Sequence, residues 1–413
     1  MGEEATAQEG TAAEADRRAL AGVRVLDIAT FLAAPFAGTV LADFGAEVIK
    51  IEQPKVGDPL RRFGTPTEAG DTLVWLSEAR NKKSVTLDLR TERGAEIFRA
   101  LVARSDVVLE NFRPGTLEKW GLGYDALCQV NPAIIVLRVS AYGQTGPMRD
   151  KPGFARIAHG FGGLSALAGE PGGTPVVPGS TSLADYMSGM WGAIGVLLAL
   201  RARDATGKGQ YIDIALYESV FRVLDEIAPA YARHGFVRER MGADTVNVAP
   251  HSHYRTGSGE WVAIACTSDK MWERLAAVMG RPELAAAPEL ATSPARAART
   301  AEVNRIVGEW VAGLSLADVL ARCDAGEVPC GPLYSIADIF ADAQYRARGN
   351  LVEVEDPRVG PLVLPAAVPR LSETPAELRH TGRALGADTA EVLGRLAGLG
   401  PEVLRELKDA GVI

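Results

Sequence analysis

The sequence is poor in cysteine and lacks the motifs that would assign several common enzyme chemistries. Its four cysteines show no CxxC spacing and no nearby histidine, so we expect reduced thiols in a cytoplasmic protein. No P-loop, GxSxG or HExxH string occurs, which excludes the commonest nucleotide-binding, serine-hydrolase and zinc-protease motifs. The longest apolar segment, around 190–200, is too short and too interrupted by glycine for us to predict a membrane span.

A surplus of positive charge is also missing. The chain has 44 lysines and arginines against 52 aspartates and glutamates, a net charge of −8, which gives no electrostatic basis for binding nucleic acid or an anionic membrane. Its 413 residues are enough for two domains. Residues 1–21 are acidic and lack the apolar core of a signal peptide, so we predict a disordered tail.

Short apolar runs alternate with amphipathic segments in the first half of the chain. We predict strands at 23–28, 47–52, 84–89, 106–110, 133–139 and 211–216, with helices at 32–46 and 91–104. Such β–α–β repeats predict an α/β fold with a doubly wound parallel sheet, whose ligands bind beyond the carboxyl ends of the strands. From about 240 the pattern changes to a hairpin followed by helices, a compact α+β insert.

Polar elements lie at the ends of three predicted strands. Asn81-Lys82-Lys83 precedes one strand, segment 110–115 leaves another and segment 141–147 leaves a third. Four basic residues from this region are candidates to hold phosphate oxygens: Lys82, Lys83, Arg113 and Lys119. Ordinary solvated surface charge accounts for their presence equally well. The string GxGxxA at 121–126 follows a helical segment instead of a strand, so we reject it as a dinucleotide-binding motif.

The segment 176–202 contains the most informative helix. Apolar residues at 183, 187, 190, 194 and 197 predict a helix that begins near Leu183 with these positions as its core face. Asp185 falls in the first turn, where the helix dipole favours a carboxylate, and shares a face with Gly189 and Gly192. Either the glycines form a helix-packing notch beside a dipole-complementing acid, or they leave a bare surface where a ligand approaches the carboxylate closely.

His251 and His253 lie on one face of a predicted strand. Two histidines are too few for a zinc site, so we predict no metal. The remaining interpretations are contact with a substrate carboxylate and ordinary exposed or core histidines.

The chain resembles the class III CoA-transferases, the family of formyl-CoA transferase and carnitine CoA-transferase, from residue 22 to residue 413. The motifs that carry the resemblance are GVRVLDIATFLAAPFAG (22–38), LADFGAEVIKIEQPKVGDPLR (41–61), RNKKSVTLDLRTERG (80–94), VVLENFRPGTLEKWGLGY (107–124), YGQTGPMRDKPGF (142–154), SLADYMSGMWGAIGVLLAL (182–200), TGKGQYIDIALYES (206–219) and VPCGP (328–332).

The resemblance implies a Rossmann-like large domain formed by 22–235 and 331–413, a small α+β domain at 236–330, and an interlocked dimer. It implies that Asp185 is the catalytic aspartate and that Asn111, Arg113 and Lys119 meet the CoA nucleotide. Leu32 and Gln53 stand where formyl-CoA transferase has a glutamine and an arginine, Ala155 replaces a glutamate beside the site, and the glycine run that closes over oxalate is missing. Oxalate is therefore not the expected substrate.

The implied chemistry needs no permanently bound cofactor, because coenzyme A and its thioesters are the substrates. The Asp185 carboxylate attacks a thioester to form a mixed anhydride, CoA thiolate returns to form an aspartyl-CoA thioester, and an acceptor acid reverses the sequence. Gly143 and Gln144 are candidates beside the thioester, where N–H donors stabilise oxyanions.

A cationic acyl pocket would suit a second carboxylate, so we expect dicarboxylic acids such as succinyl, malyl or mesaconyl groups. The candidates to face the acyl end are Arg156, His159, His251, His253 and Arg255. A homodimer is expected, and a second kind of subunit is possible. Two alternatives stay open: a 2-methylacyl-CoA racemase of the same fold, and a non-catalytic CoA-binding partner subunit.

Overall fold

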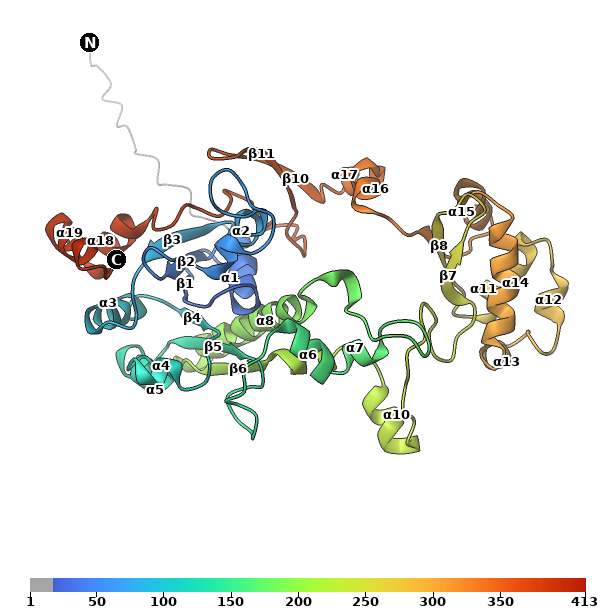
Figure 1. Cartoon of the computed structure of the whole chain (residues 1–413), viewed down its shortest axis with the longest axis horizontal. Coiled ribbons are helices and arrows are strands. Elements are labelled where there is room, and N and C mark those ends of the chain that lie inside the picture. Colours follow the sequence, from blue (N-terminus) through green and yellow to red (C-terminus); the bar gives the residue numbers. More distant parts are fainter. Residues whose placement is uncertain (1–17) are drawn as a thin grey trace, which may run out of the picture. The chain divides into compact units, whose positions relative to one another are not determined.

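The computed structural model describes residues 18–413, which form two compact units (Figure 1). The first unit contains the chain up to Leu164, Ser180–Asp225 and Gly349–Ile413. The second contains Ser165–Gly179 and Glu226–Arg348, so the short stretch 165–179 groups with it instead of with the domain expected at 22–235. Most of the tail predicted at 1–21 lies outside the described residues.

The first unit is built around a six-stranded parallel sheet in the order β3-β2-β1-β4-β5-β6. Val25 of β1 lies opposite Val48 of β2 on one side and Val107 of β4 on the other. This is the order of doubly wound α/β folds, which confirms the predicted fold class; the order reverses between β1 and β4. The strands are β1 (Arg24–Asp27), β2 (Glu47–Glu52), β3 (Lys82–Thr86), β4 (Val107–Glu110), β5 (Ile135–Ser140) and β6 (Tyr211–Ala215).

Helices cover both faces of this sheet, because successive strand residues point to opposite sides. Val25 and Val107 pack against α1 (Ala33–Asp43) and α8 (Leu183–Thr206). Leu26 and Val108 belong to the core on the other side. That core is completed by α3 (Glu92–Val102), α5 (Tyr124–Val130), α18 (Thr389–Ala397) and α19 (Pro401–Asp409). Thr91 caps α3, since its hydroxyl accepts the Gly94 N–H.

The prediction for the core face of α8 is wrong. The helix begins at Leu183, as expected, and ends at Thr206, where the C-cap Gly207 has a left-handed φ of 71°. However, Met190 and Ile194 are about half exposed, whereas Gly189 and Gly192 are buried. By length and composition α8 is also long and apolar enough to cross a membrane, so shortness does not exclude a span.

Close packing explains why α8 turns its glycines inward. A Cβ on Gly189 would lie 2.7 Å from the Ala33 carbonyl oxygen of α1. A Cβ on Gly192 would lie 2.7 Å from the Leu137 side chain of β5. The glycines therefore form the packing notch that seats α8 against α1 and the sheet, as core helices of globular proteins do, and they leave no bare surface for a ligand.

Shorter elements complete the first unit. After β6 the chain forms two short helices, of which α9 (Leu216–Phe221) lies here and α10 (Ile227–His234) lies in the second unit. The others are η1 (Pro59–Arg62), α2 (Leu73–Glu78), α4 (Thr116–Lys119), α6 (Ala155–Phe161), η2 (Pro178–Ser180) and the hairpin β10 (Leu351–Asp356) and β11 (Gly360–Pro365); α7 (Leu164–Leu167) begins at the boundary between the units.

The second unit is an α+β structure around a three-stranded antiparallel sheet. Its strands are β7 (His251–Arg255), β8 (Trp261–Ala265) and β9 (Cys330–Pro332), and the predicted hairpin between β7 and β8 is confirmed. Trp272 and Val307 are fully buried in its core. Its helices after β8 are α11 (Asp269–Val278), α12 (Glu283–Ala286), α13 (Ser293–Ala297), α14 (Thr300–Ala312), α15 (Leu316–Ala325), α16 (Ile336–Ala341) and α17 (Ala343–Ala347).

Candidate active site

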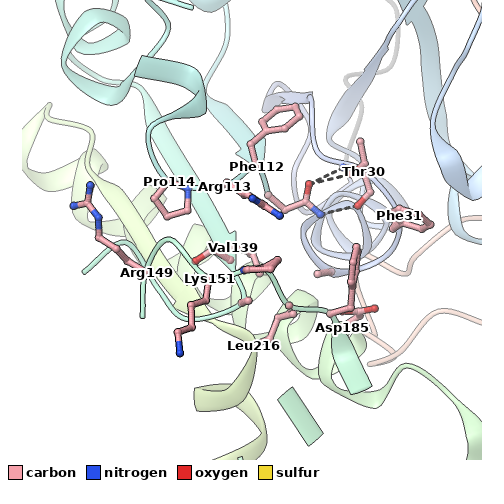
Figure 2. Close-up of a pocket in the computed structure, with 17 residues that line it drawn as sticks. Thr30, Phe31, Phe112, Arg113, Pro114, Val139, Arg149, Lys151, Asp185 and Leu216 are labelled. Carbon is pink, nitrogen blue, oxygen red and sulfur yellow. Dashed lines mark hydrogen bonds between the residues drawn. The ribbon is translucent and has the colours of Figure 1, made fainter. Parts of the chain in front are cut away.

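A pocket of about 300 Å³ opens in the first unit at the carboxyl edge of the sheet, where the strand order reverses (Figure 2). Loops that follow β1, β4 and β5 form its walls, which is where open α/β sheets bind ligands. The side chain of Asp185, from the first turn of α8, completes the wall. The lining residues are Thr30, Phe31, Ala33, Asn111, Phe112, Arg113, Pro114, Val139, Ser140, Ala141, Arg149, Lys151, Pro152, Gly153, Phe154, Asp185 and Leu216.

Asn111 ties the exits of β1 and β4 together. Its Oδ1 accepts the Thr30 N–H at 2.8 Å and its Nδ2 donates to the Thr30 carbonyl oxygen at 2.7 Å (Figure 2). Both ends of the amide are therefore already hydrogen-bonded. Asn111 lines the pocket, and its hydrogen bonds hold the two loops together.

Glu110 fixes the loop that carries Arg113. One carboxylate oxygen accepts the Phe112 N–H at 2.8 Å, and the other pairs with Arg138 at 2.7 Å. Burial raises the pKa of the Glu110 carboxyl to about 7, against the opposing effect of Arg138. The backbone that presents Arg113 is thus held by a buried, hydrogen-bonded side chain.

Phe31 lines the pocket in a strained backbone conformation. Its φ of 59° is left-handed, which a non-glycine residue adopts only when its surroundings hold it there. The Phe31 N–H donates to Asp58 Oδ1 at 3.0 Å, and Lys50 holds Asp58 by an ion pair of 2.8 Å. The phenyl ring packs edge-on against the ring of Phe154 from the loop after β5.

Asp185 is an isolated carboxylate. Within residues 18–413 its side chain has no hydrogen-bond or ion-pair partner, although it lies in the pocket wall. Burial alone raises its pKa from the ordinary 3.8 to about 7. A carboxylate that has lost most of its water and has no compensating cation is more nucleophilic than one in solution.

Three cations share the pocket with Asp185. Figure 2 shows Arg113, Arg149 and Lys151 on one side and Asp185 with Phe31 on the other. In the described part of the chain, neither the Arg113 guanidinium nor the Lys151 ammonium has an ion-pair partner, whereas Arg149 contacts Asp150 at 3.5 Å. The pocket therefore presents unpaired positive charge to any anionic ligand.

A second pocket of about 210 Å³ adjoins the first, because Thr30 and Phe112 line both. It lies beyond the ends of β1, β2 and β3 and includes Gln53 and Trp120. Together the two pockets form a groove along the carboxyl edge of the sheet.

Lys82 and Lys83 do not line this groove. They are the first two residues of β3, because that strand begins earlier than predicted, and their side chains point to opposite faces of the sheet. The Lys82 ammonium is buried, at 3.0 Å from Asp27 and 2.6 Å from the Pro35 carbonyl oxygen. Lys83 pairs with Glu47, at the amino end of β2, and with Glu391.

Three further candidates lie outside both pockets. Lys119 is exposed at the end of α4. Gly143 has the left-handed φ of 85° that its turn requires, and the Gln144 N–H donates to both carboxylate oxygens of Asp213, at 3.1 and 3.0 Å. That N–H is occupied and is not free to stabilise an oxyanion.

The five residues expected at the acyl end are dispersed. Arg156 is exposed on α6, whereas His159 on the same helix is 1% exposed and accepts the Ala184 N–H at 2.9 Å. His251, His253 and Arg255 lie on β7 of the second unit. Residues 18–413 contain no group of three or more histidine, cysteine, aspartate or glutamate side chains arranged to hold a metal ion.

Sequence reasoning missed Thr30, Phe31, Arg149 and Lys151 as pocket residues. A signal was present for the last two, because both lie in the exit loop of β5 within the motif YGQTGPMRDKPGF. Thr30 and Phe31 carried the same signal, because they follow β1 within the motif GVRVLDIATFLAAPFAG; the left-handed backbone of Phe31, held by Asp58, has no counterpart in the sequence pattern.

Comparison with known proteins agrees with this fold. The model of CoA-transferase family III matches residues 20–389. The beta and alpha subunits of succinyl-CoA–L-malate CoA-transferase from Chloroflexus aurantiacus are 56% and 53% identical over 95% of this chain, and the matches cover 98% and 92% of those proteins. The crystal structure of a CaiB/BaiF family protein from Brucella suis matches with a TM-score of 0.81 and 36% identity, over 92% of this chain and 99% of that one.

The chain belongs to CoA-transferase family III. It is an enzyme whose substrates are a CoA thioester and a carboxylic acid, as the resemblance predicted.

Proposed function

We propose that this enzyme transfers CoA from succinyl-CoA to a second dicarboxylic acid, with Asp185 as the covalent relay. The observation that carries the proposal is the unpartnered, half-buried Asp185 carboxylate in a pocket that also holds Arg113, Arg149 and Lys151. The relatives named as succinyl-CoA–L-malate transferases make L-malate the first acceptor to test.

The cations of the pocket match the charge of these substrates. A succinyl or malyl group keeps one free carboxylate after its other carboxyl has become a thioester. Arg113 and Lys151 have no ion-pair partner within residues 18–413, so a substrate anion would supply the missing negative charge. The phosphates of CoA compete for the same cations, and the adjoining pocket beyond β2 and β3 is the proposed place for the nucleotide.

The transfer takes four displacements at three carbonyl carbons: those of the donor, of Asp185 and of the acceptor. A carboxylate oxygen of Asp185 attacks the thioester, the C–S bond breaks, and a mixed anhydride and CoA thiolate form. The thiolate attacks the aspartyl carbonyl, which releases the donor acid and leaves an aspartyl-CoA thioester. The acceptor carboxylate then displaces the thiolate from this thioester to form a second anhydride. Attack of the thiolate on the acceptor carbonyl yields the new acyl-CoA and restores Asp185.

Proton abstraction at C2, which a racemase requires, is not supported by the pocket. Such chemistry needs a second base opposite Asp185. No other carboxylate and no imidazole lies among the pocket-lining residues that the structure describes.

We also propose that a second copy of the chain covers the outward face of α8. Trp191, Leu197 and Leu198, with Met190 and Ile194, form a continuous exposed apolar surface on this helix. Isolated soluble proteins rarely expose such a surface on one helix. In the proposed cytoplasmic dimer, contact with the second copy would cover the apolar face of α8, a helix whose length and composition resemble those of a membrane span. Mixing with a paralogous subunit, suggested by the alpha and beta names of the relatives, is the competing outcome.

A trapping experiment tests the relay. The purified protein is incubated with succinyl-CoA and then with hydroxylamine, which converts an aspartyl thioester or anhydride to a hydroxamate, and peptides are analysed by mass. We expect the label on Asp185, and malyl-CoA when L-malate is added, with citramalate and glutarate as comparison acceptors. No label on Asp185 during turnover, or deuterium uptake at C2 without an acceptor acid, would overturn the proposal.

A further inference from the structure

The first turn of α8 has an unusual cap. Four N–H groups at the start of any α-helix lack a partner within the helix, and a serine at the N-cap normally accepts one of them. The N-cap of α8 is Ser182, but its hydroxyl makes no capping hydrogen bond. The Ala184 N–H is completely buried and donates instead to Nε2 of His159, at 2.9 Å.

The hydrogen bond determines the state of His159. Because Nε2 accepts, the proton of the neutral ring is on Nδ1, and an imidazolium could not accept the Ala184 N–H. Burial lowers the pKa of the imidazole, and Arg156, one turn earlier on α6, lowers it further. Nδ1 has no partner within residues 18–413, so the side chain makes this one hydrogen bond.

We propose that His159 is a positioning residue for the transfer reaction: it holds the first turn of α8 and thereby the Asp185 carboxylate that follows Ala184. The proposal rests on the catalytic role proposed for Asp185. The Asp185 side chain has no partner of its own, and its N–H donates to the Ser182 carbonyl oxygen at 2.9 Å. The backbone of the first turn is therefore what orients the carboxylate toward the thioester carbon.

The assignment differs from the role expected from the sequence. His159 is not exposed to the pocket, so it is not a contact for the acyl carboxylate. Its effect reaches the substrate only through the backbone of residues 184 and 185. A displacement of about 1 Å at a nucleophile costs up to about a hundredfold in rate.

Two variants of His159 distinguish the effect of the accepting nitrogen from the effect of the volume of the ring. His159→Phe removes the acceptor and keeps an aromatic ring, whereas His159→Gln offers an amide oxygen near the position of Nε2. We expect the phenylalanine variant to lose about 10- to 100-fold in kcat, with KM for succinyl-CoA changed less than about threefold. The glutamine variant should retain kcat within about threefold. Ser182→Ala is the control, because that hydroxyl caps nothing, and it should behave as wild type.

Amide hydrogen exchange at Ala184 tests the hydrogen bond without any turnover. We expect exchange at least about tenfold faster in His159→Phe than in wild type or His159→Gln. Unchanged exchange, or unchanged kcat in folded His159→Phe, would overturn the proposal, as would a change confined to KM. If His159→Phe does not fold, loss of kcat in folded His159→Gln would also overturn it. Absence of transfer by the wild type would refute the proposed function, while the exchange comparison would still test the cap.

Discussion

Replacing Asp185 by asparagine should abolish transfer and yet stabilise the protein. The native carboxylate is half-buried without a partner, and its pKa of about 7 is well above the ordinary 3.8. One pKa unit corresponds to about 1.4 kcal/mol, so full ionisation in the folded state costs at most about 4 kcal/mol. Partial exposure reduces this, and we expect about 2 kcal/mol above pH 8. Asp185→Asn keeps the shape of the side chain and removes the cost.

The sign of the pH dependence follows from the raised pKa. Between pH 4 and pH 7 the folded protein holds a proton on Asp185 that the unfolded chain has released, so rising pH destabilises the wild type. Asparagine does not titrate. The variant should therefore gain stability relative to the wild type as pH rises from 4 to 7, and the difference should stay constant above about pH 8.

Thermal unfolding measured from pH 5 to pH 9 tests this reasoning. We expect a melting temperature at pH 8 several degrees higher for Asp185→Asn, with a smaller difference at pH 5. Asp204→Asn, an exposed substitution on the same helix, is the matched control and should show no pH-dependent difference. A variant less stable than the wild type at pH 8, or a difference independent of pH, would show that Asp185 does not titrate near 7.

Four further predictions follow from the geometry. Because only ionised Asp185 attacks, kcat/KM should fall about tenfold for each pH unit below about 7, and a flat profile to pH 5 in the free enzyme would contradict the raised pKa. Lys82→Ala should lower the free energy of unfolding by about 3–5 kcal/mol, because it removes one partner of the buried ion pair with Asp27. Lys151→Ala should instead raise KM for succinyl-CoA about tenfold without changing the melting temperature. Urea denaturation and steady-state kinetics on both variants check this, and the reverse result would show that Lys82 belongs to the binding site. Gly189→Ala should destabilise by about 1–3 kcal/mol by pushing α8 away from α1, while Gly160→Ala, whose added methyl meets no atom within 4 Å, should not. Leu198→Glu should convert a dimer to monomers in light scattering, whereas Val130→Glu, at a less exposed apolar position on α5, should not. An unchanged mass for Leu198→Glu would remove α8 from the interface.

The sequence was sufficient to predict the sheet and the family. The segments 24–27, 47–52 and 107–110 are strands whose valine, leucine and isoleucine residues suit a parallel strand buried on both faces. The order of motifs along the chain was specific enough to identify the family. Asp185 was selected for the same reason, although its helical spacing alone favoured a simple dipole-complementing acid.

Side-chain partners could not be predicted, because they depend on residues distant in sequence. Lys82 and Lys151 look alike in a sequence, yet Lys82 is buried against Asp27, 55 residues earlier, and Lys151 faces the pocket. Similarly, the sequence presents His159 as a candidate ligand contact, whereas in the structure its Nε2 accepts the Ala184 N–H.

Helix α8 shows which features follow from the local sequence and which follow from tertiary packing. The sequence by itself predicted where this helix begins and its helical period, since periodicity is a local property, whereas its first turn is capped by His159 of α6. Only the tertiary structure decided which face turned inward. Close contact with α1 and β5 leaves no room for side chains, so the glycine face is buried and the larger apolar residues point outward. The same packing withdraws Asp185 from most of its water, and this burial, which no local pattern encodes, is what raises its pKa.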